Sequence, residues 1–200
     1  MKKCQGLDDA RRELVALKHS EDAQMHKTLL IFYYTGLKYL NSKFQFKLND
    51  SDAVSIAFTW RDSLTGQEYT STEGLELEMN SILFNLAAVM NNIGSTIPIT
   101  ADSIKTVSME FQSAAWIYDH MCKTLEKLDS DLRGLDFRSD NLKRLMYLQL
   151  AQSQYCFFKK AEIAEMKPGL ISKVAKQVYD YFRDSDGHSK ASLKSDLEKY

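Results

Sequence analysis

The sequence contains few of the residues that interrupt helices or cross-link a chain. Its 200 residues include only two prolines, eight glycines and three cysteines. So few helix breakers predict long, uninterrupted helices. Cys4, Cys122 and Cys156 are far apart and odd in number, which excludes a disulfide framework and favours a reducing compartment.

Long hydrophobic runs and a strong charge of one sign are also missing. No apolar run reaches the roughly 18 residues that a membrane-spanning helix needs, and the stretch MKKCQGLDDARRELVALK has no signal-peptide core. The net charge of -1 gives no general attraction to nucleic acid or to acidic membranes, and a hydrophobic content of 44% is typical of soluble globular proteins. We therefore expect a cytoplasmic protein with no nucleic-acid partner and no transmembrane segment.

Motifs for catalysis, cofactor binding and metal binding are absent from the sequence. The four histidines are isolated, and there is no glycine-rich phosphate loop, dinucleotide fingerprint or nucleophile elbow. Asp62 could be imagined as a general acid, but a turn at a strand end or an ion pair with Arg61 explains it better. Cys122 and Cys156 lie in apolar helical patterns, which indicates inert buried thiols. We predict a binding protein, not an enzyme, with no catalytic residue, cofactor or metal.

Helical periodicity dominates the rest of the chain. Gly94 is the expected C-cap of one helix, and Asp102 is the expected N-cap of the next. The polar residues 184–200 are expected to fray. Apolar residues recur at spacings of three and four, which predicts helices over 8–19, 21–40, 72–94, 103–128, 139–166 and 169–182.

One segment departs from the helical pattern. The stretch AVSIAFTW, residues 53–60, is β-branched and aromatic, which predicts one strand followed by a polar loop, with Phe58 and Trp60 as core anchors. Small residues beside aromatic ones suit tetratricopeptide-like hairpins, although no strict repeat is visible. The expected fold is therefore mainly α: an array of antiparallel helices with a small strand region near 53–61, forming one domain over 1–200.

Several stretches together resemble the BRO domain family. They occur in the family's order and spacing and cover most of residues 22–182. The resemblance implies a curved array of helices on a tetratricopeptide-like core. The family's first strands and later helices are not matched, so it also implies a partial domain. The stretches are SKFQFKLNDSDAVSIAFTWRDSL (42–64), LELEMNSILFNLAAVMNNIG (75–94), IKTVSMEFQSAAWIY (104–118) and LQLAQSQYCFFKKAEIAEMKPGLISKVAKQVYDYF (148–182).

The resemblance also implies a function. BRO domains are docking modules of the endosomal sorting (ESCRT) pathway, and a concave hydrophobic patch receives the amphipathic C-terminal helix of an ESCRT-III subunit. This activity supports multivesicular body sorting and membrane scission. We accordingly expect recruitment to endosomal membranes through partners. Two alternatives stay open: a BRO-fold scaffold with another partner, such as a rhophilin-like signalling adaptor, or a helical-repeat protein that binds some other peptide.

The family's contacts can be carried over residue by residue. Phe157 falls on a patch aromatic, Leu170 and Val174 on patch aliphatics, and Lys105 on a charged contact at the rim. An acidic rim residue of the family falls on Ala101, and the neighbouring Asp102 is the candidate to replace it. In addition, Trp116 stands where relatives often carry glycine, which should change local helix packing.

For the two adjacent phenylalanines of CFFKK, the family resemblance and the helical periodicity give opposite predictions. Neighbouring residues on a helix point about 100° apart, so both rings rarely share one stripe. Phe157 shares a stripe with Leu142, Met146 and Leu150, whereas Phe158 does not, so periodicity alone predicts Phe157 as the core ring. The resemblance implies the reverse, with Phe158 packed inside and Phe157 on the docking surface. We expect the second assignment, in which Phe157 is exposed beside Leu170 and Val174.

Overall fold

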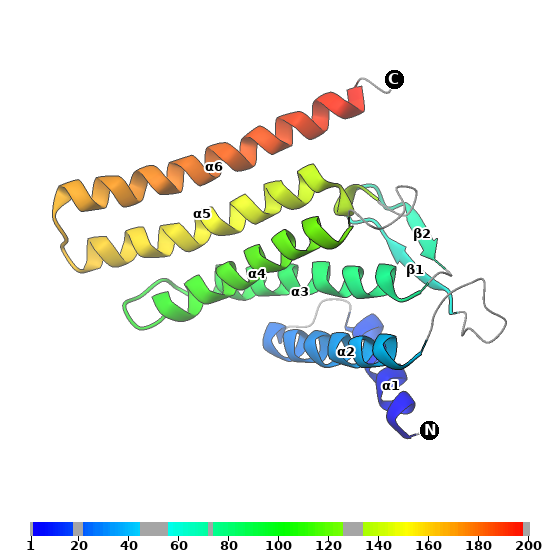
Figure 1. The fold of residues 1–200 in the computed structure, drawn as a ribbon. Helices are drawn as coiled ribbons and strands as arrows, with labels where there is room; N and C mark the ends of the chain where they lie inside the picture. Colours follow the sequence, from blue (N-terminus) through cyan, green and yellow to red (C-terminus); the bar gives the residue numbers. More distant parts are fainter. Residues whose placement is uncertain (1, 18–21, 45–55, 72–73, 126–133, 198–200) are drawn as a thin grey trace. The chain divides into compact units, whose positions relative to one another are not determined.

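The computed structural model describes residues 2–17, 22–44, 56–71, 74–125 and 134–197 (Figure 1). The expected mainly α fold with a small β region is confirmed. The elements are α1 (Lys2–Ala16), α2 (Ala23–Lys43), β1 (Phe58–Arg61), β2 (Glu68–Ser71), α3 (Glu76–Thr96), α4 (Ile104–Thr124), the 3-10 helix η3 (Leu135–Phe137), α5 (Ser139–Ile163) and α6 (Pro168–Leu197).

The chain divides into two compact units. The first consists of Met1–Val89 and Lys127–Leu135, and the second of Met90–Glu126 and Asp136–Tyr200. The grouping of both units into one domain over 1–200 stays a prediction. The first unit holds α1, α2, the strands and most of α3, whereas α4, α5 and α6 belong to the second.

The strands of the first unit form a hairpin where the sequence predicted one strand and a polar loop. β1 and β2 pair antiparallel. Asp62 accepts hydrogen bonds from the backbone N–H groups of Leu64 and Thr65 at 3.0 and 2.9 Å, which confirms its role in a turn. Arg61 pairs with Glu68 at 2.8 Å across the hairpin. The loop prediction missed β2 because its strand character comes from this pairing and not from its own polar sequence.

The helices of the first unit begin at positions set by local caps and packing. α2 starts after Asp22, whose carboxylate accepts the Met25 N–H at 2.9 Å. It buries Leu30, Tyr33 and Leu37, at spacings of three and four. α1 begins at residue 2, six residues before the predicted start at 8.

At the connection between α3 and α4, neither predicted cap residue has the position that the sequence predicted. α3 continues to Thr96, so Gly94 lies inside the helix. A Cβ at Gly94 would lie 2.9 Å from the Phe111 ring, so the absence of a side chain serves a close helix approach and not a C-cap. The N-cap position of α4 is Ser103, and the predicted cap Asp102 is exposed in the preceding turn. The Ser103 hydroxyl instead accepts the Thr100 N–H at 2.8 Å.

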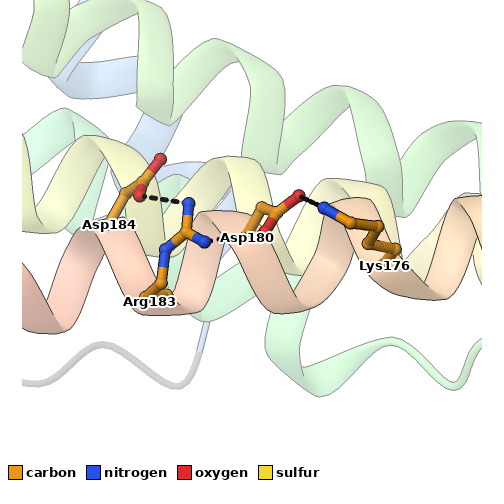
Figure 2. A network of polar contacts seen from close by, with 4 residues as sticks. All are labelled: Lys176, Asp180, Arg183 and Asp184. Atoms are coloured by element: carbon orange, nitrogen blue, oxygen red, sulfur yellow. Dashed lines mark hydrogen bonds and ion pairs between the residues drawn. The ribbon is translucent and has the colours of Figure 1, made fainter.

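The last helix is much longer than predicted. α6 runs from Pro168 to Leu197, which is 15 residues beyond the predicted end at 182, and the expected fraying of 184–200 stays a prediction. Polar residues continue the helix because they pair at helical spacing: Asp180 binds Lys176 at 2.7 Å and Arg183 at 3.2 Å (Figure 2). Ser185 also donates a hydrogen bond to the Arg144 carbonyl of α5 at 2.9 Å, which ties this part of α6 to its neighbour.

The turn that joins α5 to α6 is a tight Schellman motif. The Met166 N–H donates to the Ala161 carbonyl at 3.1 Å, and the Glu165 N–H donates to the Glu162 carbonyl at 3.0 Å. This closure requires a left-handed residue at Glu165, whose φ is 47°. Glycine occupies that position in most such motifs because other residues pay a steric cost there.

Replacing Glu165 with glycine is therefore expected to raise the free energy of unfolding by about 0.5–1 kcal/mol, since it removes that steric cost. Urea denaturation measures the change. The matched control is Glu162→Gly, at a right-handed helical position, which should lower stability by about 1 kcal/mol. Equal effects of the two variants would mean that the Glu165 backbone is not strained.

Candidate peptide-binding surface

Helix α5 of the second unit is packed on two sides. Toward α4, Cys156 is fully buried in a cluster with Ile104, Val107 and Phe111. Toward α6, the Tyr147 ring lies 6.4 Å from the Tyr181 ring. Figure 1 shows the three helices side by side, with α5 in the middle and adjacent helices antiparallel. A central helix of this kind has two buried stripes of residues, one toward each neighbouring helix. The surface of α5 between these two stripes is open.

Phe157 lies in the open stripe between those two packed sides. It is 40% exposed. Its neighbour Cys156 faces α4, and Phe158 is half-buried, with its ring stacked on Tyr155 at 5.9 Å. Phe158 also follows Tyr147 by three helical turns and so shares the stripe that faces α6. The expected exposure of Phe157 is thus found, and the periodicity-based prediction of a core Phe157 is wrong.

Leu170 and Val174 of α6 lie level with Phe157 along the helix axes. The bond from Ser185 to the Arg144 carbonyl sets the register of the antiparallel pair. Both helices rise about 1.5 Å per residue, so position 157 is level with position 172, midway between Leu170 and Val174. Leu170 is 48% exposed and Val174 is half-buried.

Leu170 and Val174 belong to the stripe of α6 that faces α5. Tyr181, which contacts α5, lies within about 20° of Leu170 and Val174 around α6. On the far side of the layer, a cavity of about 400 Å³ is lined by Gly94, Ser95, Ile97, Ile99, Phe111, Gln152, Tyr155 and Phe182. Tyr155 is two residues before Phe157 and therefore points about 160° away from it. Phe157 consequently lies opposite this cavity, whereas Leu170 and Val174 lie on the stripe of α6 that faces α5.

Lys105 on α4 belongs to the same side as Phe157. Gln112 donates to the Ser153 hydroxyl of α5 at 3.1 Å. Ser153 lies within about 40° of Phe157 around α5, and Gln112 within about 20° of Lys105 around α4. Lys105 is exposed, and Asp102 is exposed in the turn before α4. Their roles as rim contacts stay predictions.

Two further apolar side chains on this side were missed by the sequence reasoning. Met109 is 54% exposed and Trp116 is 64% exposed. Both lie within about 60° of Gln112 around α4, and the register through Gln112 places Met109 roughly level with Phe157. The Trp116 ring stacks on His120, with centroids 5.3 Å apart. The sequence showed that Trp116 is unusual at its position. Only the packing of α5 against α4 shows that the Trp116 side chain lies outside the interface between these helices.

The first unit is organised around a buried carboxylate. Glu78 of α3 has no exposed surface and accepts hydrogen bonds from Arg11 at 3.0 Å, from the Tyr33 hydroxyl at 2.7 Å and from the Trp60 indole. Burial, reinforced by the Glu78 carboxylate, raises the pKa of Tyr33 well above its usual range. The sequence marked Phe58 and Trp60 as anchors, and Phe58 is buried while Trp60 is half-buried. Glu78 was missed because one acid in an amphipathic helix reads as a surface residue.

Two other features were searched for in the described part of the chain. Within it, no three histidine, cysteine, aspartate or glutamate side chains gather closely enough to hold a metal ion. None of the helices described is both long and apolar enough to cross a membrane.

Comparison with known proteins identifies the family to which the chain belongs. The sequence model of the BRO1-like domain matches residues 1–199. The chain belongs to the BRO1-like domain family. It is similar to the programmed cell death 6-interacting protein of Rattus norvegicus, with 30% identity over 86% of this chain. It is also similar to the vacuolar protein-sorting protein BRO1 of Gibberella zeae, with 28% identity over 90% of this chain.

Solved structures share the fold. The ALIX BRO1 CHMP4C complex matches with a TM-score of 0.83 and 27% identity over 94% of this chain. A Bro1 domain described as a basis for endosomal targeting matches with a TM-score of 0.73 at 20% identity, which shows the fold alone. The chain spans 54% of the ALIX BRO1 chain, 20% of the rat relative and 17% of the fungal one.

Proposed function

We propose that this protein is a non-enzymatic docking module that binds the C-terminal amphipathic helix of an ESCRT-III subunit. The docking surface consists of Phe157, Leu170 and Val174, with Lys105 and Asp102 at its rim. The observation that carries the proposal is the exposed Phe157 ring, level with Leu170 and Val174 along the axes of α5 and α6. The similarity to an ALIX BRO1 domain solved with CHMP4C supports the choice of partner.

The chemistry of the surface fits an amphipathic helix. Apolar side chains on two adjacent helices form a band that can receive residues spaced three and four apart on an incoming helix. Lys105 can pair with an acid on the polar edge of that helix, although an exposed pair contributes only about 0–1 kcal/mol. Affinity should therefore come mainly from the apolar band, and charge should affect specificity and association rate.

In the cell, the proposed role is that of a scaffold in endosomal sorting. The protein would be cytoplasmic and recruited to endosomes through its partners, where it would support multivesicular body sorting and membrane scission. We further propose that residues 1–200 form a single, partial BRO domain. The family match over 1–199 supports this grouping.

A binding titration tests the proposal. Fluorescence polarisation of a labelled ESCRT-III C-terminal helix should give saturable binding at micromolar concentrations, about -8 kcal/mol. A peptide of the same composition with its apolar residues scrambled off one face is the control. Equal binding of both peptides, or no binding of either, would contradict the proposal and favour another partner for the same fold.

Trp116 offers a built-in reporter of this binding. Its ring is exposed on the side of α4 that carries Lys105, so a bound helix should exclude water from it. We expect the tryptophan emission to shift to shorter wavelength as the ESCRT-III helix is added. Trp116→Phe should abolish the shift while leaving polarisation-detected binding within about threefold, since the ring lies beside the docking surface. An unchanged emission spectrum at saturation would place the bound helix away from α4.

A further inference from the structure

Helix α2 of the first unit carries two apolar faces, and one of them is exposed. Its buried residues include Leu30 and Leu37, which belong to the core of the unit. A second set recurs every seven positions: Met25 is 44% exposed, Phe32 is 55% exposed and Tyr39 is 56% exposed. A spacing of seven turns each side chain only about 20° from the previous one, so the three form a stripe along the helix. Large exposed apolar side chains in a continuous stripe indicate a surface that is covered in some functional state.

The exposed stripe has the heptad pattern of a coiled-coil helix. With Phe32 at position a, the other two exposed apolar residues also occupy a, and the buried Leu30 and Leu37 occupy f. Position f lies opposite the a and d positions, so these positions point away from the core of the unit. Position d carries three exposed hydroxyl residues. The six residues at a and d, which we call the α2 seam, are Met25, Thr28, Phe32, Thr35, Tyr39 and Ser42.

A partner can cover the hydroxyls of the α2 seam without leaving a donor unsatisfied. Each hydroxyl already donates to a backbone carbonyl of α2, three or four residues earlier, at 2.7–2.9 Å. Burial of a hydroxyl is unfavourable mainly when it loses its hydrogen bond. Side chains this small also let a second helix approach closely, with its own large apolar residues between the rings of Phe32 and Tyr39.

The positions that flank the α2 seam are basic. Residues 23–43 contain three lysines and no acidic residue. Lys38 occupies position g and Lys43 occupies position e, where charges select the partner of a coiled-coil helix. Their ammonium groups lie 6.0 Å from the centroid of the Tyr34 ring and 5.7 Å from that of the Tyr39 ring. In the part of the chain that the structure describes, neither lysine pairs with a carboxylate.

Charge and shape select the kind of partner. Two α2 helices packed antiparallel would bring Lys38 against Lys38 and Lys43 against Lys43, and no acidic residue of α2 could compensate, so a second copy is disfavoured. A bilayer accepts a broad apolar face, whereas the hydroxyls make half of this seam polar. A helix that carries acidic residues beside a narrow apolar stripe complements both the charge and the shape of the seam.

We propose that the α2 seam docks an amphipathic partner helix that is apolar at its a and d positions and acidic at its e and g positions. The partner lies along α2 at a small crossing angle, and its acids pair with Lys38 and Lys43. The seam belongs to the first unit and uses none of the residues of the ESCRT-III docking surface. It is therefore a docking site additional to the one in the second unit.

A designed helix tests the proposal on the full chain. The glutamate probe is a labelled peptide of three heptads with leucine at a and d and glutamate at e and g, where the like charges keep the peptide from pairing with itself. Fluorescence polarisation should show saturable binding that weakens at high salt. The control is the lysine probe, with lysine at e and g, which should bind at least about fivefold more weakly.

Variants of the chain locate the bound probe. Phe32→Ser with Tyr39→Ser should weaken binding of the glutamate probe at least about tenfold, because aromatic side chains carry much of the binding energy of an interface. Lys38→Glu with Lys43→Glu should reverse the preference between the two probes. Leu64→Ser is the matched control, 60% exposed between β1 and β2 of the same unit, and should leave binding unchanged. Circular dichroism should be unchanged in all three, because the five side chains are exposed.

The Phe157→Asp variant should bind the glutamate probe as tightly as the unchanged chain, which separates failure of this proposal from failure of the proposed function. Equal binding of the two probes, or full binding by the double serine variant, would overturn the proposal. Loss of the probe in the Phe157 variant would also overturn it, because the probe would then occupy the ESCRT-III docking surface. A dimer of the chain, or binding to phosphatidylserine vesicles, that the double serine variant abolishes would assign the seam to a second copy or to a bilayer instead.

Discussion

Glu78→Ala is expected to lower the free energy of unfolding of the first unit by about 3–5 kcal/mol, because it removes one partner of a buried charged cluster. Glu78 receives hydrogen bonds from α1, α2 and β1 through Arg11, Tyr33 and Trp60. Without the carboxylate, the buried Tyr33 hydroxyl and the half-buried Trp60 indole lose their acceptor. Chemical denaturation followed by circular dichroism measures the loss.

Glu68→Ala is the matched control for this prediction. Glu68 belongs to the same unit and also pairs with an arginine, Arg61, but the side chains of both partners are more than half exposed. Its removal should cost no more than about 1 kcal/mol. If the Glu78 and Glu68 variants lose similar amounts of stability, the buried carboxylate is not the centre of the first unit.

Phe157→Asp is expected to weaken binding of the ESCRT-III helix by at least about 100-fold, because a buried charge without a partner replaces an apolar contact at the centre of the surface. The substitution should leave the helical circular dichroism unchanged, since Phe157 is 40% exposed and lies between the two packed stripes of α5. Fluorescence polarisation with the labelled helix measures the affinity.

Two further variants serve as controls for the Phe157→Asp prediction. Tyr179→Asp places the same charge at another exposed aromatic of α6, 63% exposed and nine residues after Leu170, hence on the opposite side of that helix. It should leave binding intact. Phe158→Asp should lower stability, because Phe158 is half-buried on the stripe that faces α6. Unfolding of the Phe157 variant, or a Tyr179 variant that binds as poorly, would contradict the assignment.

Elements set by local pattern could be predicted from the sequence. The apolar repeat of α4, in which Val107, Phe111, Ala114 and Tyr118 are all buried, predicted that helix to within a few residues. Prediction failed where tertiary contacts determine the role of a residue or the length of a helix. Gly94 was read as a cap because its role depends on the Phe111 ring of another helix. The length of α6 was underestimated because the ion pair of Arg183 with Asp184 and the bond from Ser185 to α5 only exist once the helix has formed and packed.

The residues of the candidate surface also divide into those that could be predicted from the sequence and those that could not. Periodicity placed Phe157 in a core because a helical wheel assumes one buried side, whereas α5 has two. Resemblance to the BRO domain family supplied Phe157, Leu170 and Val174. Met109 and Trp116 were not predicted as part of this side, since their position depends on the register between α4 and α5 through Gln112 and Ser153. The sequence pattern of a single helix does not show on which side of a helix layer a residue lies.

The most direct test of the account is a methyl NMR titration of the chain with the ESCRT-III helix. Leu170 and Val174 report on the docking surface, and Met109 reports on its α4 side. Ile97 and Ile99 report on the cavity at the opposite side of the helix layer. We predict that the methyl signals of Leu170, Val174 and Met109 shift during the titration while those of Ile97 and Ile99 stay in place. Shifts confined to Ile97 and Ile99 would contradict the account, because the partner would then occupy the side facing away from Phe157.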